Sequence, residues 1–521
     1  MATAGDSGGQ LGRSPPQLPP ALAAVARMKA IMVVGTTSHA GKSMLATALC
    51  RILSRRGKRI TPFKGQNMAL NAYVAPSGGE MGYAQAVQAW AAGISPWVEM
   101  NPILLKPQGD STSQVIIRGK AVGTTTAAAY YEQYFERGWQ AITESLHRLA
   151  AEFDVIVCEG AGSPAEVNLK HRDLTNMRVA KYLNAVTVLI VDIDRGGCFA
   201  HVVGTLALLD PEERALIKGI VINKFRGQLS ILQPGINWLE EYTGIPVLGV
   251  LPWSENLLPA EDSLSLLERK ARKDQQEVSL AIIRLPRIAN FTDFDPLDAE
   301  PTVGVKYVGL EDRLGYPDAV ILPGSKTTLS DLKALHDSGM AKKIQDFVAA
   351  GGTVFGVCGG FQMLGDRIAD PQGLEGEAGE QIGLQLLPVK TTITPDKVTR
   401  QRTCLSHYPH EGLVVEGYEI HQGQTQWLTH RRTKPVDLPQ ALFDDLSLGM
   451  VDASHSVWGC YLHGIFDNGP WRRTWLNHLR QRRGLLSLPT GVPNYREQRE
   501  IMLNSLANLV EEHLDLTPIL G

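Results

Sequence analysis

Short apolar runs alternate with helix-patterned segments twice along the chain, and this alternation limits the possible folds more than any other feature. In the first half the runs are residues 30–35, 153–160, 185–192 and 217–224. In the second half they are residues 279–286, 319–325, 352–360 and 458–464. Apolar runs of this length, separated by helices and ended by polar or glycine-rich turns, are typical of parallel sheets that helices cover on both faces. We therefore predict an α/β fold with two doubly wound domains, whose chemistry lies at the carboxyl ends of the strands.

Composition divides the 521 residues into five segments. Residues 1–28 are rich in Gly, Pro, Ser and Ala and lack the apolar stretch of a secretory signal, so we expect a disordered extension. The first domain is expected over 29–260 and a charged linker over 261–278. The second domain is expected over 279–485, and residues 486–521 have the pattern of an acidic amphipathic helix that caps it.

Charge and cysteine content exclude several classes of protein. The formal net charge is -3 with scattered Lys and Arg, so we expect no nucleic-acid partner. The most apolar run, residues 185–191, is too short to span a bilayer, and we expect no membrane partner. The six cysteines form no CxxC pair, which argues against disulfides and zinc and favours a reducing, cytoplasmic location. Nothing in the sequence sets the oligomeric state.

The segment GTTSHAGKS (35–43) follows a strand and opens a helix, as a phosphate-binding loop requires. Its backbone N–H groups would face the phosphates of a nucleotide, and Lys42 would reach the β and γ oxygens. The Ser43 hydroxyl would hold Mg²⁺. We therefore predict ATP and Mg²⁺ as cofactors, with the nucleotide bound by Gly35, Thr36, Gly41, Lys42 and Ser43.

Five residues separate Gly35 from Gly41, one more than the usual spacing. The pattern GxxxxxGK[ST] resembles dethiobiotin synthetase and its ligase relatives, which make an acyl phosphate from a carboxylate and ATP. The resemblance extends to EGAGSPAEVNL (159–169) and implies Glu159 as a magnesium ligand, although a carboxylate at a strand end is often only a helix cap. It also implies that Asn223, at the end of IVINK, hydrogen-bonds adenine.

Other polar residues of the first half are further candidates for this site. Glu80, in GGEMGYAQ, is a candidate for a further metal ligand. Lys64, in PFKGQN, would neutralise a phosphate or a substrate carboxylate; the alternative is a solvated surface lysine. Asp192 and Asp194 follow a third strand and could touch metal or substrate.

The second half contains GTVFGVCGGFQMLG (352–365), in which a strand, a glycine-framed Cys358 and a helix follow one another. A sharp strand-to-helix turn exposes a nucleophile, and a helix N-terminus favours its thiolate form. A lone cysteine is usually an inert apolar residue, but Cys358 lies in a turn rather than in a periodic apolar run. We therefore predict that Cys358 is a catalytic nucleophile.

The base is expected at His463, in CYLHGIF, 105 residues later, an order that resembles class I glutamine amidotransferases. Those enzymes have His-x-Glu, whereas this chain has Ile465, so we expect a Cys–His dyad without a charged third member. The Gly359 N–H and the backbone near Gly324 would form the oxyanion hole, and Gln362 would contact glutamine.

Longer phrases narrow the family. They are PFKGQNMALNA (62–72), NPILLKPQGD (101–110), RLPRIANFTDFDPL (284–297), VILPGSKTTLSDL (320–332), YEIHQGQT (418–425) and YLHGIFDN (461–468). They resemble the cobyric acid synthase family of cobalamin biosynthesis. This resemblance implies successive amidations of adenosylcobyrinic a,c-diamide at its b, d, e and g carboxylates, each using ATP and glutamine. It also implies a water-poor passage that carries ammonia between the domains.

Three alternatives remain. The sister family, cobyrinic a,c-diamide synthase, has an acidic GPDYIDP-like phrase where this chain has GQNMALN, with Gln66, Asn67 and Asn71. A partition-type ATPase carries a lysine after the first glycine of the loop, where this chain has Thr36. A second domain without catalysis would fit the missing third member, but Cys358 and its histidine partner both stand at motif positions.

Overall fold

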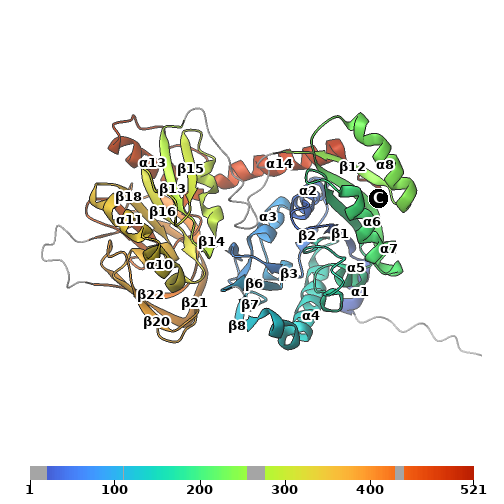
Figure 1. Cartoon of the computed structure of the whole chain (residues 1–521), viewed down its shortest axis with the longest axis horizontal. Helices are drawn as coiled ribbons and strands as arrows, with labels where there is room; N and C mark the ends of the chain where they lie inside the picture. Colours follow the sequence, from blue (N-terminus) through green and yellow to red (C-terminus); the bar gives the residue numbers. More distant parts are fainter. Residues whose placement is uncertain (1–19, 110, 255–275, 429–438, 521) are drawn as a thin grey trace, which may run out of the picture.

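The computed structural model describes residues 20–109, 111–254, 276–428 and 439–520, which form two α/β domains (Figure 1). The first domain is built on a parallel sheet. Its strands, in sheet order, are β12 (Val247–Pro252), β11 (Ile217–Phe225), β10 (Val186–Asp192), β1 (Lys29–Gly35), β9 (Val155–Glu159) and β2 (Ile60–Phe63). The strands predicted from the apolar runs of the first half are all present in this sheet.

The second domain has a mixed sheet that is parallel as far as β25 and antiparallel beyond it. Its strands, in sheet order, are β15 (Val303–Val308), β13 (Val278–Ile283), β16 (Ala319–Leu322), β18 (Thr353–Val357), β25 (Val457–Cys460), β24 (Gly449–Val451) and β23 (Gln440–Ala441). The helices beside it are α10 (Thr328–Asp337), α11 (Met340–Ala349), α12 (Gly359–Leu364) and α13 (Gly469–Arg482). The prediction of two α/β domains is therefore confirmed.

Both faces of the first sheet are buried, which explains why its strands are apolar throughout. Successive residues of a strand point to opposite faces. In β1, Met32 and Val34 belong to the core on one face, whereas Ile31 and Val33 belong to the core on the other. The helices over the first of these cores are α1 (Pro20–Arg27), α4 (Ala127–Glu152), α5 (Met177–Leu183), α6 (Cys198–Leu208) and α8 (Leu229–Thr243). Those over the second are α2 (Lys42–Arg55), α3 (Tyr83–Ala91), α14 (Tyr495–His513) and α15 (Thr517–Leu520).

The start of the chain differs from the prediction. Residues 1–28 were expected to be disordered, but α1 packs on α4 and buries Val25 and Met28 in the core. A proline at the first helical position and four alanines after it favour this helix. Residues 1–19 lie outside the described residues, as does most of the expected linker, whose last residue already begins β13.

The C-terminal helix α14 crosses from the second domain to the first (Figure 1). The prediction that it caps the second domain is wrong, because its apolar face packs on α2 and on the edge strand β12. Leu503, Leu506 and Val510 are fully buried in the core of the first domain. Beyond α14, the Asp515 N–H donates to the carbonyl of Leu248 at 2.7 Å and so extends the edge of the sheet. The final residues of the chain therefore complete the first domain.

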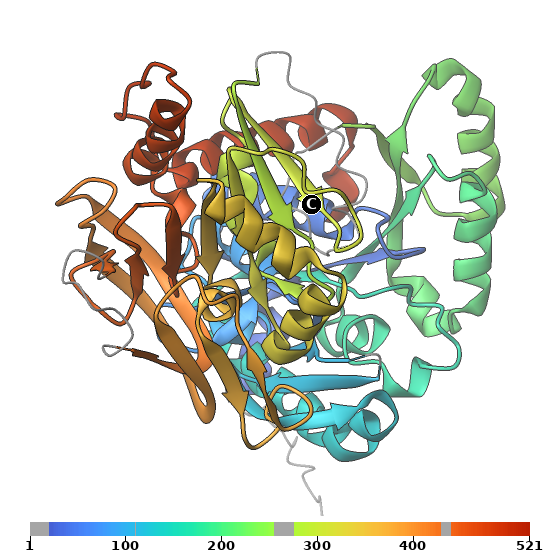
Figure 2. The same cartoon turned by 60° about the vertical axis from the view of Figure 1, so that its left-hand side comes forward.

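Smaller sheets accompany the two main sheets (Figure 2). Those of the first domain comprise β3 (Gln66–Met68), β6 (Ile103–Pro107), β7 (Thr112–Ile117) and β8 (Lys120–Thr126), with β4 (Ala72–Val74) paired to β5 (Glu80–Gly82). Those of the second comprise β20 (Gly379–Ile382), β19 (Arg367–Asp370), β21 (Val389–Leu405) and β22 (Val414–Trp427), with β14 (Ile288–Ala289) paired to β17 (Gly324–Ser325).

Two of the phrases singled out in the sequence meet at this interface. The backbone N–H of Phe291 donates to Asn71 Oδ1 at 3.0 Å, and Asn290 Nδ2 donates to the carbonyl of Ala72 at 3.1 Å. Ala72 returns a bond from its N–H to Asn290 Oδ1 at 3.2 Å. The first domain therefore holds the segment 288–294 of the second. Among the described helices, none offers a stretch both long and apolar enough to cross a membrane.

Candidate active site

The predicted phosphate-binding loop joins β1 to α2. Gly41 has φ 110°, a conformation that only glycine adopts easily, and the next residue begins the helix. Lys42 is buried, and its Nζ donates to the carbonyls of Thr37 and Gly162 at 3.0 Å each. The loop thus joins a strand to a helix N-terminus, as in a phosphate-binding loop, and hydrogen bonds fix the side chain of Lys42 beside it.

Glu159, at the end of β9, lies at the centre of this site and is 1% exposed. Its Oε1 accepts from Ser43 Oγ and from Lys64 Nζ, both at 2.8 Å. Its Oε2 accepts from Gln88 Nε2 at 2.6 Å. The predicted residues Ser43, Lys64 and Glu159 therefore come together. A hydroxyl and a carboxylate on neighbouring elements are ligands that suit Mg²⁺ beside phosphate oxygens.

Glu80 does not join this group. Its Oε2 accepts from Lys106 Nζ at 3.0 Å, and its Oε1 forms an ion pair with Lys397 of the second domain. Burial alone would raise the pKa of Glu80, but the two lysines lower it to about 2. Both oxygens are thus taken by cations at the domain interface, which argues against the predicted role as a metal ligand.

The other polar residues predicted for this site face the loop or the neighbouring strands. Asn223 is 2% exposed, and its Nδ2 donates to the carbonyl of Ala40 in the loop at 2.9 Å, so this atom braces the loop. Asp192 pairs with Lys224 at 2.8 Å, and Asp194 pairs with Arg226 at 3.0 Å. The adenine contact predicted for Asn223 stays a prediction.

Cys358 lies between β18 and α12 with φ 52°, as a strained strand-to-helix turn requires. His463 lies just after the end of β25, the strand that pairs with β18. Gly324 lies on the other side of the histidine, where an added Cβ would be 3.4 Å from His463 Cε1. An added Cβ on Gly359 would be 2.8 Å from the backbone N of Ser325. The predicted nucleophile, base and oxyanion backbone are therefore neighbours.

A third member of the site exists, and the predicted dyad is wrong in this respect. Asp293 Oδ2 lies 2.7 Å from His463 Nδ1, and Asp293 Oδ1 accepts from the Gly464 N–H at 3.0 Å. Ile465, which stands where relatives have Glu, is fully buried in the apolar core. The carboxylate that orients the imidazole thus comes from the segment 288–294.

The charges around the ring decide its protonation. Burial by itself would lower the pKa of His463, but the negative charges of Asp293 and Cys358, both hydrogen-bonded to the ring, raise it to about 10. At neutral pH the imidazole of His463 is therefore protonated.

These groups line a cavity of about 40 Å³ that also contains charged residues from both domains. They are Lys106, Lys326, Glu375 and Lys397. Burial, together with the charge of Lys397, lowers the pKa of Lys326 to about 8, and burial raises the pKa of Glu375.

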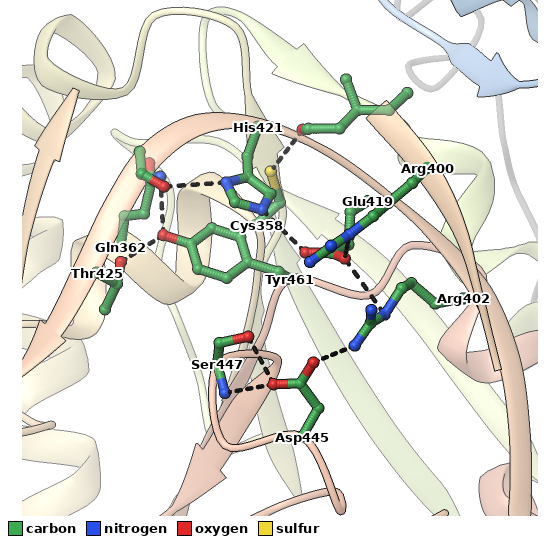
Figure 3. A network of polar contacts seen from close by, with 12 residues as sticks. Cys358, Gln362, Arg400, Arg402, Glu419, His421, Thr425, Asp445, Ser447 and Tyr461 are labelled. Atoms are coloured by element: carbon green, nitrogen blue, oxygen red, sulfur yellow. Dashed lines mark hydrogen bonds and ion pairs between the residues drawn. The ribbon is translucent and has the colours of Figure 1, made fainter. Parts of the chain in front are cut away.

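Polar side chains beside Cys358 form a connected network (Figure 3). Gln362 Nε2 donates to Tyr461 Oη at 3.1 Å, and the Tyr461 ring stacks on His421 with 3.8 Å between centroids. His421 Nε2 lies 3.1 Å from Glu419 Oε2, and its Nδ1 lies 3.0 Å from the carbonyl of Gly423. Both ring nitrogens of His421 face acceptors, whereas His463 is hydrogen-bonded to Cys358 and to Asp293. His463 is therefore the better base.

Several of these residues were missed from the sequence. Asp293 lay inside a quoted phrase, NFTDFDPL, but no spacing rule connected it to His463. Gln88 and Lys397 carry no motif, because their partners come from distant segments. His421 also lay in a quoted phrase, YEIHQGQT, beside Glu419.

Comparison with known proteins follows this division into domains. Residues 31–266 match the model of the CobQ/CobB/MinD/ParA nucleotide binding domain. Residues 279–471 match the model of the CobB/CobQ-like glutamine amidotransferase domain. A cobyric acid synthase of Nostoc sp. (strain PCC 7120 / SAG 25.82 / UTEX 2576) is 69% identical over 95% of this chain and 99% of its own length. One from Crocosphaera subtropica (strain ATCC 51142 / BH68) is 69% identical over 95% of this chain and 100% of its own length. The chain thus belongs to the cobyric acid synthase family.

Proposed function

We propose that this chain amidates the b, d, e and g carboxylates of adenosylcobyrinic a,c-diamide and uses one ATP and one glutamine for each. The observation that carries the proposal is the pairing of two sites in one chain. A Cys358–His463–Asp293 triad lies in one domain, and a phosphate-binding loop with Glu159 lies in the other. A carboxylate is a poor electrophile, so it must be activated before nitrogen can attack it.

Activation belongs to the first domain. Lys42 and the loop N–H groups would hold the ATP phosphates, and Lys64 would hold the substrate carboxylate or the transferred phosphoryl group. A magnesium ion held by Ser43 and Glu159 would neutralise charge on the phosphate oxygens. The carboxylate oxygen attacks the γ-phosphorus, ADP leaves, and the acyl phosphate so formed has a good leaving group.

Nitrogen release belongs to the second domain. The Cys358 thiolate attacks the glutamine amide, and the oxyanion is held by backbone N–H groups near Gly359 and Ser325. The His463 imidazolium gives its proton to the departing nitrogen, so ammonia leaves and a thioester remains. Water, deprotonated by the same imidazole, then hydrolyses the thioester to glutamate. Asp293 holds the ring in position throughout.

Mass spectrometry of the corrinoid product separates this function from the sister reaction. With ATP, glutamine and adenosylcobyrinic a,c-diamide, we expect four successive carboxylate-to-amide mass steps. Amidation of cobyrinic acid at two positions, with no reaction of the a,c-diamide, would instead assign the chain to cobyrinic a,c-diamide synthesis.

Replacement of the nucleophile separates the two sites. Cys358→Ala should lose glutamine-dependent amidation by at least ~10³-fold. It should keep amidation from high ammonium at alkaline pH, because the activated carboxylate lies in the other domain. Cys404→Ala, which removes a buried cysteine of the same domain, should use both nitrogen sources normally. If Cys358→Ala still used glutamine well, the assignment of the nucleophile would be wrong.

A further inference from the structure

Ammonia made at Cys358 has to reach the other domain, and an apolar cluster between the domains begins beside the thiol. Cys358 Sγ donates to the carbonyl of Ile420 at 3.4 Å. The Ile420 side chain packs with residues of β3–β4, β6 and β7 in a buried cluster that joins the domains. Its members are Ala69, Ala72, Val74, Leu104, Ile116, Tyr418 and Ile420. Such surroundings favour neutral ammonia over ammonium, because burying a charge is costly.

Polar side chains continue from this cluster toward the nucleotide site. Asn67 on β3 lies opposite Leu104 on β6, so the two side chains share the face that meets the second domain. Asn67 is 4% exposed, and its Nδ2 donates to Gln85 Oε1 at 3.0 Å. Asn67 is one of the residues that distinguish this chain from the sister family. The path thus passes from the apolar cluster to α3.

Helix α3 carries the path to Glu159. Gln85 and Gln88 are one turn apart on the same side of the helix, and both are fully buried. Gln88 Nε2 donates to Glu159 Oε2 at 2.6 Å. The other oxygen of Glu159 contacts Ser43 and Lys64. A series of buried residues therefore connects Cys358 with the place where the carboxylate is activated.

Two atoms of this series have unused hydrogen-bonding capacity. Gln85 Nε2 and Gln88 Oε1 find no hydrogen-bond partner among the described residues. An unpaired buried amide group is costly, so each of the two atoms would gain from a small ligand. One atom is a donor and the other is an acceptor. Ammonia suits either atom, since its lone pair can accept from the Gln85 amide N–H and its own N–H can donate to the Gln88 amide oxygen. Ammonium has no lone pair and matches only the acceptor.

We propose that Gln85 and Gln88 form a binding site for neutral ammonia on its way from Cys358 to the activated carboxylate. The site rests on the proposed function, because it needs ammonia to be made in one domain and consumed in the other. It accounts for two fully buried glutamines on the same side of α3 whose side chains are only half satisfied.

The test is the ratio of glutamate released to amide bonds formed, measured in the complete protein with ATP, glutamine and the corrinoid substrate. In Gln85→Met, which keeps the side-chain length but removes both the donor and the acceptor of the amide, this ratio should rise severalfold above one. Glutamate release itself and amidation from added ammonium should stay near normal. The expected cause is that ammonia escapes before it reaches the acyl phosphate.

Two controls distinguish the loss of an ammonia site from a general defect in packing. Ser145→Ala removes another buried atom that has no partner within the described residues, but from α4, and its ratio should stay near one. Gln85→Leu repeats the test with a second shape, and thermal unfolding verifies that each variant is folded.

The outcomes are distinct. A ratio that stays near one in both Gln85 variants would overturn the proposal and leave the two amides as a site for a buried water. Equal loss with glutamine and with ammonium would overturn it too and would assign Gln85 to the synthetase reaction. If the unsubstituted protein formed no amide from either nitrogen source, the proposed function itself would fail.

Discussion

Asp293 and His463 are 170 positions apart in the chain, yet their side chains form a hydrogen bond of 2.7 Å. The carboxylate and the imidazole lie in different segments, so the usual His-x-Glu spacing gave no information about them. The position that the spacing rule examines holds Ile465, which is buried in the apolar core. The nucleophile and the base were predictable because each stands in a local strand-to-turn motif. The orienting residue was not, because only the fold brings it there.

The first prediction concerns Asp293→Asn. An amide keeps the size but loses the charge, so glutamine hydrolysis should fall by at least ~10²-fold. Asp293 also raises the pKa of His463, and an imidazolium exists only below that pKa. Without the charge, the alkaline limb of the pH profile of hydrolysis should move to lower pH. Ammonia-dependent amidation should be unchanged, and Asp298→Asn in the next helix, α9 (Asp295–Asp298), is the control. An unchanged pH profile would contradict the role of Asp293.

The second prediction concerns Lys326, which we expect to hold the carboxylate of glutamine, with Glu375 facing the ammonium group. Because the pKa of Lys326 is lowered to about 8, its charge is present below that pH and lost above it. The KM for glutamine should therefore rise above about pH 8. Loss of one charged hydrogen bond costs about 1.5–3 kcal/mol, so Lys326→Met should raise the KM roughly 10- to 100-fold.

In the same variant, the rise above pH 8 should disappear while kcat changes little. Lys390→Met, an exposed lysine of β21, should behave like the unsubstituted protein. A KM that still rises near pH 8 in Lys326→Met would assign the titration to another group.

At the scale of elements, apolar patterning predicted four strands of each main sheet but not the location of α14. The buried residues of α14 form one stripe along the helix. Such a stripe predicts that one face of the helix is buried, but it does not identify the surface that covers it. The surface that α14 covers belongs to the first domain. Its edge strand β12 lacks a neighbour on one side, and the backbone after α14 pairs with it there. The long hairpin β21–β22 escaped prediction because much of it is exposed and its apolar alternation is weak.

The third prediction tests α14. Leu506→Ala should destabilise the first domain by about 2–5 kcal/mol, because it leaves a cavity in a fully buried site. Amide hydrogen exchange in α2 and β12 should accelerate, while the sheet of the second domain should exchange as before. Ile501→Ala, on the same helix but 69% exposed, should change neither. Faster exchange in the second domain alone would contradict the packing described for α14.

At the scale of the whole molecule, the two domains share the parts that make the glutaminase site. Asn71 of the first domain holds the backbone of Phe291, two residues before Asp293. Lys397 of the second domain pairs with Glu80 of the first at the edge of the same cavity. The first domain therefore positions the residue that orients His463. Domains are predicted from patterns within short stretches of sequence. The Asn71–Phe291 and Glu80–Lys397 contacts join residues far apart in the chain, so no such pattern indicates them.

The fourth prediction is that Asn71→Ala slows glutamine hydrolysis although Asn71 belongs to the other domain. The change leaves the Phe291 N–H without its acceptor, at a cost of about 1–3 kcal/mol, and loosens the segment that carries Asp293. We expect roughly a tenfold loss of glutamate formation with ammonia-dependent amidation retained. Asn508→Ala, whose side chain pairs with Arg55 on the outside of α14, is the control. Normal hydrolysis in Asn71→Ala would show that this contact holds the domains together without affecting the site.

The position of α14 also bears on the order in which the chain is made. A ribosome releases the first domain's sheet long before it adds the residues that cover it, since Leu503, Leu506 and Val510 belong to that core. Until translation is complete, the face of α2 and β12 that these residues bury stays open to solvent. The amino-terminal half alone therefore lacks part of its own core. A gene divided between the two domains would yield a first polypeptide whose core is completed only by the end of the second.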